Sequence, residues 1–196
     1  MDKEAFIVGG GPSLSRFNWM ALNNKFVVAV NRAYEVLPNA QIIYITDPDF
    51  YYQHKKAMHN HAGEIVRGHL PGQSVNDTKV REITLSGSDG LDMRPGFLKH
   101  GSNSVYAAIN LLVQIGYKKI YLLGVDMKWE GKKTHWHSGH KRCDPESVYA
   151  KMIKSFNTIV EPLKQQKVTV INLNPDSGLT VFPFLPAEQI LGKCFL

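Results

Sequence analysis

Short apolar runs alternate with longer amphipathic segments along most of the chain, and this alternation predicts the elements and their order. Apolar runs rich in β-branched residues predict strands at 5–9, 25–30, 40–46, 118–126 and 167–173, with weaker ones at 64–68 and 80–85. Helical spacing predicts helices at 15–24, 49–61, 102–116, 145–166 and 186–192. Strands that alternate with helices indicate a parallel sheet with right-handed crossovers.

The predicted fold class is α/β, with a single Rossmann-like domain over residues 1–196. Its sheet is expected to be doubly wound and mainly parallel, with helices on both faces. The 196 residues and the 43% hydrophobic content are enough for one full core. Two long loops, at about 68–101 and 127–144, are rich in Gly, Asp, His and Lys, and loops of that length inside a compact domain are usually functional or mobile.

The best helix and the best strand of the chain follow one another. An apolar stripe runs along 102–116 through Val105, Ile109 and Leu112, and Gly116 ends it. The strand 118–126 then ends in Gly124 and Asp126. The helix 145–166 is predicted to begin at an Asp-Pro pair, which is a common helix start.

Charge and cysteine content restrict the partners and the compartment. The formal net charge of +6 favours anionic partners such as nucleotides or acidic sugars, while nucleic acid is possible but not favoured because no long basic tail is present. Cys143 and Cys194 stand far apart without a CxxC motif, which fits a reducing cytoplasm of a bacterium or a phage-infected host. No run of about 18 apolar residues predicts a transmembrane segment, and no signal peptide is recognisable.

Small polar residues and glycines follow almost every predicted strand, at the edge where parallel sheets bind ligands. The nucleotide-binding candidates are Gly9, Gly10, Gly11, Pro12, Ser13, Asn31, Asp47, Ser102, Asn103 and Gly124, with Asp126 as a catalytic candidate and Asn172, Asn174 and Ser177 nearby. Such groups hydrogen-bond ribose, base and phosphate. Capping and turn chemistry uses the same residue types, so both interpretations remain open for any single residue.

The stretch FIVGGGPSL at 6–14 carries a strand into three glycines and a helix start. That order is typical of phosphate binding, because free N–H groups at a helix start face an anion. A plain tight turn is the alternative. The pattern is neither GxGxxG nor GxxxxGK[ST], which argues against ordinary hydride transfer and P-loop phosphoryl transfer.

The loop THWHSGHKR at 134–142 supplies three further catalytic candidates, His135, His137 and His140. One of these histidines can act as a general base. A metal site and plain exposed histidines are the alternatives, and we assign no metal ligand because no cysteine and few carboxylates lie nearby in the sequence.

GGGPSL, AVN at 29–31, DP at 47–48, and GSNSVYAAINLLVQIGYKKIYLLGVD together resemble a superfamily shared by the bacterial family 42 sialyltransferases and the DUF115 proteins. The DUF115 group includes Maf-like glycosyltransferases and hydroxymethylpterin pyrophosphokinases of the MptE type. The chain looks most like short members encoded by phages and prophages, which carry a similar HWH-G-H loop. The resemblance covers nearly the whole chain.

By this resemblance, Gly10 to Ser13, Asn31 and Asp47 hold the nucleotide, and Gly101 to Asn103 contact the donor. His140 takes the place of the family's general base, with His135 as its upstream partner. The implied function is an inverting glycosyltransferase that uses a nucleotide-sugar donor, compatible with a CMP-linked one, and an unknown hydroxyl acceptor. A divalent cation is allowed but not required, and an oligomer is compatible with the sequence.

Two departures from the sialyltransferase pattern keep other functions open. Gly10 and Asp47 stand where the sialyltransferases have asparagines, and the segment between Gly124 and His140 is short and has no tyrosine. One alternative is a magnesium-dependent, pyrophosphokinase-like transferase in which Asp47 or Asp126 holds the cation. The other is a non-catalytic phage accessory protein that binds nucleotides or nucleic acid.

Overall fold

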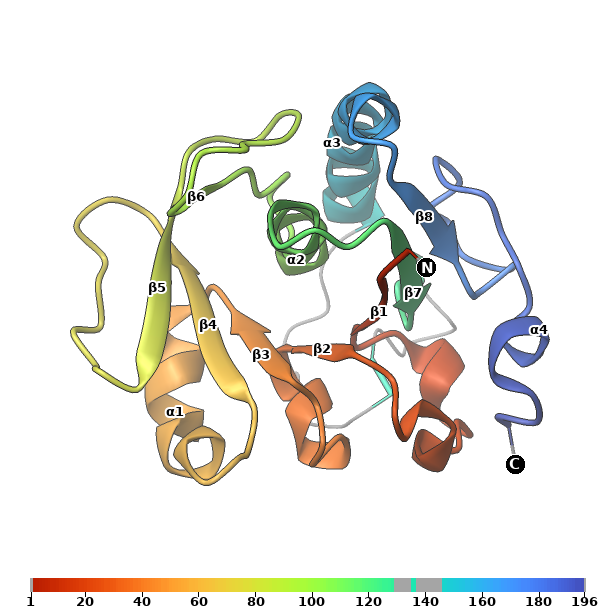
Figure 1. Ribbon diagram of the computed structural model, residues 1–196, viewed down its shortest axis with the longest axis horizontal. Helices are drawn as coiled ribbons and strands as arrows, with labels where there is room; N and C mark the ends of the chain where they lie inside the picture. Colours follow the sequence, from red (N-terminus) through yellow and green to blue (C-terminus); the bar gives the residue numbers. More distant parts are fainter. Residues whose placement is uncertain (1, 129–134, 137–145, 196) are drawn as a thin grey trace.

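The computed structural model describes residues 2–128, 135–136 and 146–195, which fold around one eight-stranded sheet (Figure 1). Its strands are β1 (Glu4–Val8), β2 (Val27–Val30), β3 (Ile42–Ile45), β4 (Glu64–His69), β5 (Val80–Leu85), β6 (Phe97–Leu98), β7 (Lys119–Leu123) and β8 (Thr169–Asn172). Every neighbouring pair is parallel, in the order β6-β5-β4-β3-β2-β1-β7-β8. The predicted Rossmann-like α/β fold class is confirmed.

The α-helices that the structure describes are α1 (Pro48–His59), α2 (Ser104–Gln114), α3 (Glu146–Gln165) and α4 (Ala187–Leu191). The helix predicted at 15–24 is wrong. The chain there forms two short 3-10 turns, η1 (Pro12–Leu14) and η2 (Trp19–Leu22), and Asn18 caps the second by accepting from the Met20 N–H. A third such turn, η3 (Asn31–Val36), follows β2. None of the described helices is long and apolar enough to cross a membrane.

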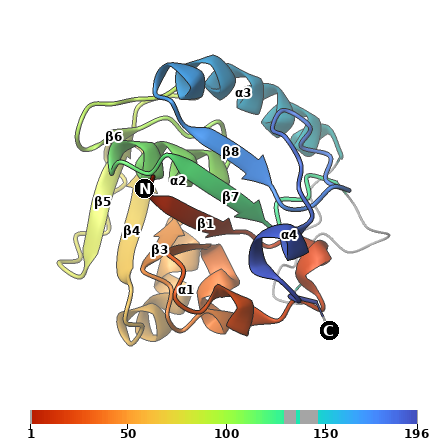
Figure 2. The same ribbon diagram turned by 45° about the vertical axis from the view of Figure 1, so that its right-hand side comes forward.

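Helices cover both faces of the sheet. Figure 2 shows α2 and α3 on one side and α1 on the other. Successive residues of β1 point to opposite faces, so Ala5 and Ile7 join the core under α2 and α3 while Phe6 and Val8 join the core on the α1 side. This two-sided burial explains why the central strands are continuous apolar runs.

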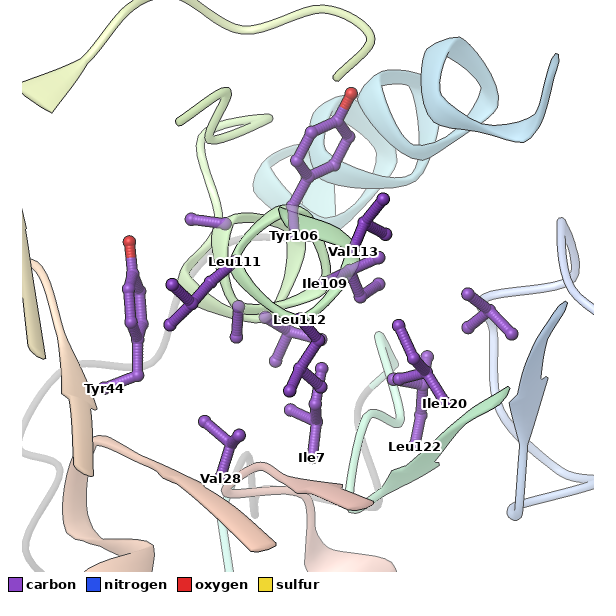
Figure 3. Close-up of a cluster of buried hydrophobic side chains, with 14 of the residues drawn as sticks. Ile7, Val28, Tyr44, Tyr106, Ile109, Leu111, Leu112, Val113, Ile120 and Leu122 are labelled. Atoms are coloured by element: carbon purple, nitrogen blue, oxygen red, sulfur yellow. The ribbon is translucent and has the colours of Figure 1, made fainter. Parts of the chain in front are cut away.

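Helix α2 is buried around most of its circumference, because it lies between the sheet and α3 (Figure 3). Leu112 and its neighbours pack on β1 and β2, whereas Tyr106 packs against Phe156 of α3 with ring centroids 5.3 Å apart. The helix is therefore buried over more of its circumference than the apolar stripe in its sequence predicts. It ends as predicted, with Gly116 at φ 89° just beyond it.

The chain changes direction across the sheet at β1. The strands β2 to β6 run outward from one side of β1, and α2 then carries the chain back to β7 on the other side. Such a topological switch point leaves a crevice beyond the carboxyl ends of the two strands, and this is where open α/β sheets bind ligands. Here the flanking segments are the glycine loop after β1 and residues 124–128 after β7.

The segment 68–101 is not one long loop, because it contains the predicted strand 80–85 as β5 and a further strand, β6, that the sequence did not indicate. Its last part is tied to α2 by the buried amide of Asn110. The Asn110 Oδ1 accepts from the N–H groups of Asp92 and Lys99, both at 2.9 Å, and its Nδ2 donates to the Asp92 carbonyl at 2.9 Å. These bonds tie the chain on both sides of β6 to α2.

Candidate functional site

A two-lobed cleft opens at the switch point. Its inner lobe, of about 230 Å³, lies between the glycine loop, residues 124–128, the start of α2, and Tyr149 and Met152 of α3. Its outer lobe, of about 250 Å³, lies between β2, β3 and the start of α1. The two lobes share four lining residues, Gly10, Val30, Asn31 and His135. We call the whole the switch-point cleft.

The three glycines of the loop are needed because other parts of the protein press against them. A Cβ on Gly9 would lie 2.7 Å from the Gly124 carbonyl oxygen, and one on Gly11 would lie 2.4 Å from Oδ2 of Asp126. A Cβ on Gly10 would lie 2.6 Å from Cδ2 of His135. The contacts at Gly9 and Gly11 leave no room for a side chain, whereas a Cβ on Gly10 would have to displace the His135 ring.

The N–H groups of the loop are largely occupied by the protein itself. Gly9 N–H donates to the Leu123 carbonyl and Gly11 N–H to the Gly124 carbonyl, each at 2.8 Å. Ser13 N–H, at the start of η1, donates to Oδ2 of Asp126 at 2.8 Å. These three amides therefore do not form the phosphate cradle of free N–H groups that the sequence predicted. The turn and close-packing interpretation accounts for them.

Asp126 ties the two strand ends together. Its buried carboxylate accepts from the Ser13 N–H and, through Oδ1, from the Ser13 hydroxyl and the Asn174 Nδ2, each of the last two at 2.7 Å. Three donors thus saturate most of its accepting capacity. The sequence pattern predicts a catalytic role for Asp126, whereas these bonds make it a group that holds the loops after β1, β7 and β8 in position.

Strained backbone gathers around the inner lobe. Asn31, Ser102 and Met127 all have positive φ values, of 52°, 56° and 47°, although none is glycine. Such conformations are costly for residues with a Cβ, and they cluster at ligand sites. All three residues line the inner lobe, and Asn31 lines both lobes with its side chain exposed.

The helices α1 and α2 both begin at the cleft. Asn103 caps α2, with its Oδ1 accepting from the Val105 N–H at 2.8 Å and the Tyr106 N–H at 3.4 Å. Asp47 caps α1 in the same way, accepting from the N–H groups of Asp49 and Phe50. The capping alternative raised for these residues is thus realised, and the N-terminal end of each helix dipole favours negative charge at the cleft.

An aromatic wall closes the outer lobe. The Phe50 ring stacks on His54 with centroids 4.2 Å apart, and the Tyr34 hydroxyl lies 2.8 Å from His54 Nδ1. Burial, and secondarily the nearby Arg32, lower the pKa of His54, while Glu35 opposes that shift. A neutral imidazole beside a flat ring is a surface on which a planar ligand can stack.

His135 and Trp136 lie over the glycine loop. The Trp136 N–H donates to the Gly10 carbonyl at 2.9 Å, its Nε1 donates to the Gly9 carbonyl at 3.3 Å, and its ring packs near Trp19. These contacts place the His135 ring at the junction of the two lobes. The other predicted histidines, His137 and His140, lie outside the described residues.

The structure thus brings together most of the predicted site, and it adds residues that the sequence did not indicate. Gly9, Gly10, Gly11, Asn31, Ser102, Asn103, Gly124 and Asp126 line the inner lobe, Asp47 lines the outer lobe, and Pro12 and Ser13 face a separate cavity. Lys128 was missed although it follows β7 by a few residues, so the rule that found Asp126 could have found it. Tyr149 and Met152 gave no such signal, because only the packing of α3 brings them here.

Among the described residues, no three His, Cys, Asp or Glu side chains are grouped as a metal site would require.

Comparison with known proteins gives one structural likeness. No protein-family model matches the chain, and no curated protein does. The fold is similar to the solved structure of the sialyltransferase CstII from Campylobacter jejuni in complex with a substrate analogue, CMP-3FNeuAc. The TM-score is 0.54 at 18% sequence identity, over 94% of this chain and 86% of that chain. At this identity the likeness shows the fold alone, which is a Rossmann-like α/β fold.

Proposed function

We propose that the chain is a glycosyltransferase that binds a nucleotide-sugar donor in the switch-point cleft. The observation that carries this proposal is the cleft itself, which lies at the carboxyl ends of β1 and β7 and collects Asn31, Lys128 and His135 around the start of α2. The sialyltransferase with a similar fold was solved with a CMP-linked substrate analogue, which supports a CMP-linked donor here.

The chemistry of each lobe supports a particular part of the donor. The outer lobe offers the Phe50–His54 stack and polar groups for a nucleoside. The inner lobe offers the Lys128 ammonium and the N-terminal end of α2, both of which favour the phosphate. The free glycine-loop amides predicted from the sequence have no part in this arrangement, because the protein uses those of Gly9 and Gly11 itself.

The proposed reaction is an inverting transfer. The acceptor hydroxyl oxygen attacks the anomeric carbon of the donor sugar, the carbon–oxygen bond to the phosphate breaks, and the nucleotide leaves with the electron pair. The hydroxyl proton passes to a histidine acting as general base. By family resemblance that base is His140. Among the described histidines, His135 is the one that lines both lobes, and it is the alternative base.

The test measures binding before chemistry. Purified protein is titrated with CMP, UDP, GDP and ADP and with their common sugar conjugates, with and without magnesium, by thermal shift and calorimetry. A ligand that binds only the folded chain raises the melting temperature. We expect one nucleotide to stand out without magnesium, and its sugar conjugate to be hydrolysed slowly. No binding by any of them would overturn the proposal.

A pair of matched variants ties the binding to the cleft. Asn31 has a left-handed backbone, which glycine adopts without strain, so Asn31→Gly removes the amide and leaves the fold intact. Asn24→Gly is the control, because Asn24 is exposed with φ 62° and lies away from the cleft. We expect only Asn31→Gly to weaken nucleotide binding, by about tenfold for one lost hydrogen bond.

The same measurements separate the other two functions. A pyrophosphokinase-like transferase would require magnesium and would release a nucleoside monophosphate from a triphosphate. A non-catalytic binder would bind its ligand without turning it over, and DNA binding would weaken steeply with salt. The pyrophosphokinase-like alternative assigns a cation to Asp47 or Asp126. Both carboxylates accept hydrogen bonds from N–H groups, so no specific observation favours a bound cation there.

A further inference from the structure

A second cavity lies on the far side of Asp126 from the inner lobe, and the proposed donor site does not use it. Its volume is about 300 Å³, and it opens between η1, the residues after β7 and β8, and the start of α4. We call it the C-terminal cavity, because Phe195 is one of its lining residues. Figure 2 shows α4 beside the carboxyl ends of β7 and β8, the edge of the sheet where ligands bind.

The lining mixes apolar surface with a few polar groups, as small-molecule sites do. Leu14, Pro186 and Phe195 give apolar surface on which the carbon face of a sugar ring can lie. Asp176 and Glu188 stand at the rim with exposed carboxylates. In the described part of the chain, neither of these carboxylates forms an ion pair.

The charge of the cavity selects against anions. Asp176 lines it from the loop after β8 and Glu188 from α4, and Lys128 is the one cation among its described lining residues. A phosphorylated or carboxylated ligand would meet net negative charge, whereas sugar hydroxyls can donate to these carboxylates. A neutral saccharide fits this combination of carboxylates and apolar surface.

The cavity also borders the switch-point cleft. Gly124, Asp126 and Lys128 line both spaces, so the two spaces adjoin each other. The Asp126 carboxylate accepts hydrogen bonds from both Ser13 and Asn174. These bonds fix the residues that lie between the cavity and the inner lobe. Two adjoining sites that are held in a fixed relative position suit a reaction that joins two substrates.

We propose that the C-terminal cavity binds a neutral saccharide, which serves as the acceptor. This assignment of the acceptor rests on the proposed function. The reactive hydroxyl extends past Lys128 into the inner lobe, where it attacks the donor's anomeric carbon and loses its proton to the histidine. Asp176 and Glu188 hold the remaining hydroxyls of the saccharide.

The test observes the cavity directly. The ¹⁵N-labelled protein is titrated with the methyl glycosides of galactose, glucose and N-acetylglucosamine, and with sialic acid as an anionic comparison. We expect a neutral glycoside to shift the backbone amide signals of Asp176, Glu188 and Phe195, and sialic acid to shift them less. The inference is wrong if no neutral glycoside shifts these signals, or if the shifts occur only at cleft residues such as Asn31.

Variants then separate this inference from the proposed function. Asp176→Asn with Glu188→Gln removes two surface charges at the cavity and should weaken glycoside binding about tenfold while nucleotide affinity stays unchanged. Glu161→Gln on α3 is the control, since Glu161 is exposed there. Glycoside binding without nucleotide binding would overturn the transferase and leave the saccharide site standing. Nucleotide binding with no glycoside binding would overturn the site alone.

Discussion

The replacement Asp126→Asn distinguishes a structural carboxylate from a catalytic one. An asparagine has one accepting oxygen where Asp126 has two, and its NH₂ group must face a donor in either orientation. If the NH₂ takes the place of Oδ2 it meets the Ser13 N–H, and if it takes the place of Oδ1 it meets the Asn174 Nδ2. Rotation of the Ser13 hydroxyl relieves the third contact only.

The expected cost follows from those contacts. At least one hydrogen bond to a buried charged group is lost and a donor is left unpaired, so the free energy of unfolding should fall by about 2–4 kcal/mol. That is a large part of the ~5–15 kcal/mol typical of a whole domain. For a chain of this size, a loss of about 3 kcal/mol lowers Tm by about 6–12 °C.

Urea unfolding followed by circular dichroism measures this change. Asp176→Asn is the matched control, because Asp176 is exposed in the same region and its carboxylate accepts no hydrogen bond from the described residues. We expect the midpoint of Asp126→Asn to fall with an unchanged m value. A change below about 0.5 kcal/mol would refute the positioning role. Normal stability combined with lost donor hydrolysis would restore Asp126 as a catalytic residue.

Three further predictions concern other parts of the fold. Gly10→Ala places a Cβ 2.6 Å from the His135 ring, so calorimetry should show nucleotide affinity about tenfold lower while stability changes by less than about 1 kcal/mol; unchanged affinity would remove His135 from the site. Asn110→Ala removes three hydrogen bonds to the chain before α2 and should cost about 2–4 kcal/mol, with faster hydrogen exchange at the Asp92 and Lys99 amides; full protection there would refute the anchor. Because the pKa of His54 lies below 6.5 in the folded chain, the unfolded chain binds more protons just below that pH, so stability should fall as pH drops through 6.5. In urea unfolding at several pH values, His54→Gln should flatten that fall, and an identical slope would contradict the cause given.

The order of elements was readable from the sequence because each strand and helix carries a local pattern. Residues 27–30 and 120–123 are apolar on both faces of their strands, and only a strand covered on both sides buries them fully. The failure at 15–24 has the opposite cause. The periodicity there is weak, and Asn18 with the contacts of Phe17 to Phe195 favours short turns over a helix.

What the sequence determined by itself was the edge of the sheet at which the candidate residues gather. Parallel strands place their carboxyl ends together, so residues following each strand had to converge. The tertiary structure alone decided what each of them does. Asp126 is 113 residues from Ser13 and 48 from Asn174, and no local pattern records that its carboxylate binds both. Likewise, the three glycines predict that another group packs closely against the loop. Only the tertiary structure shows that these groups are Gly124, Asp126 and His135.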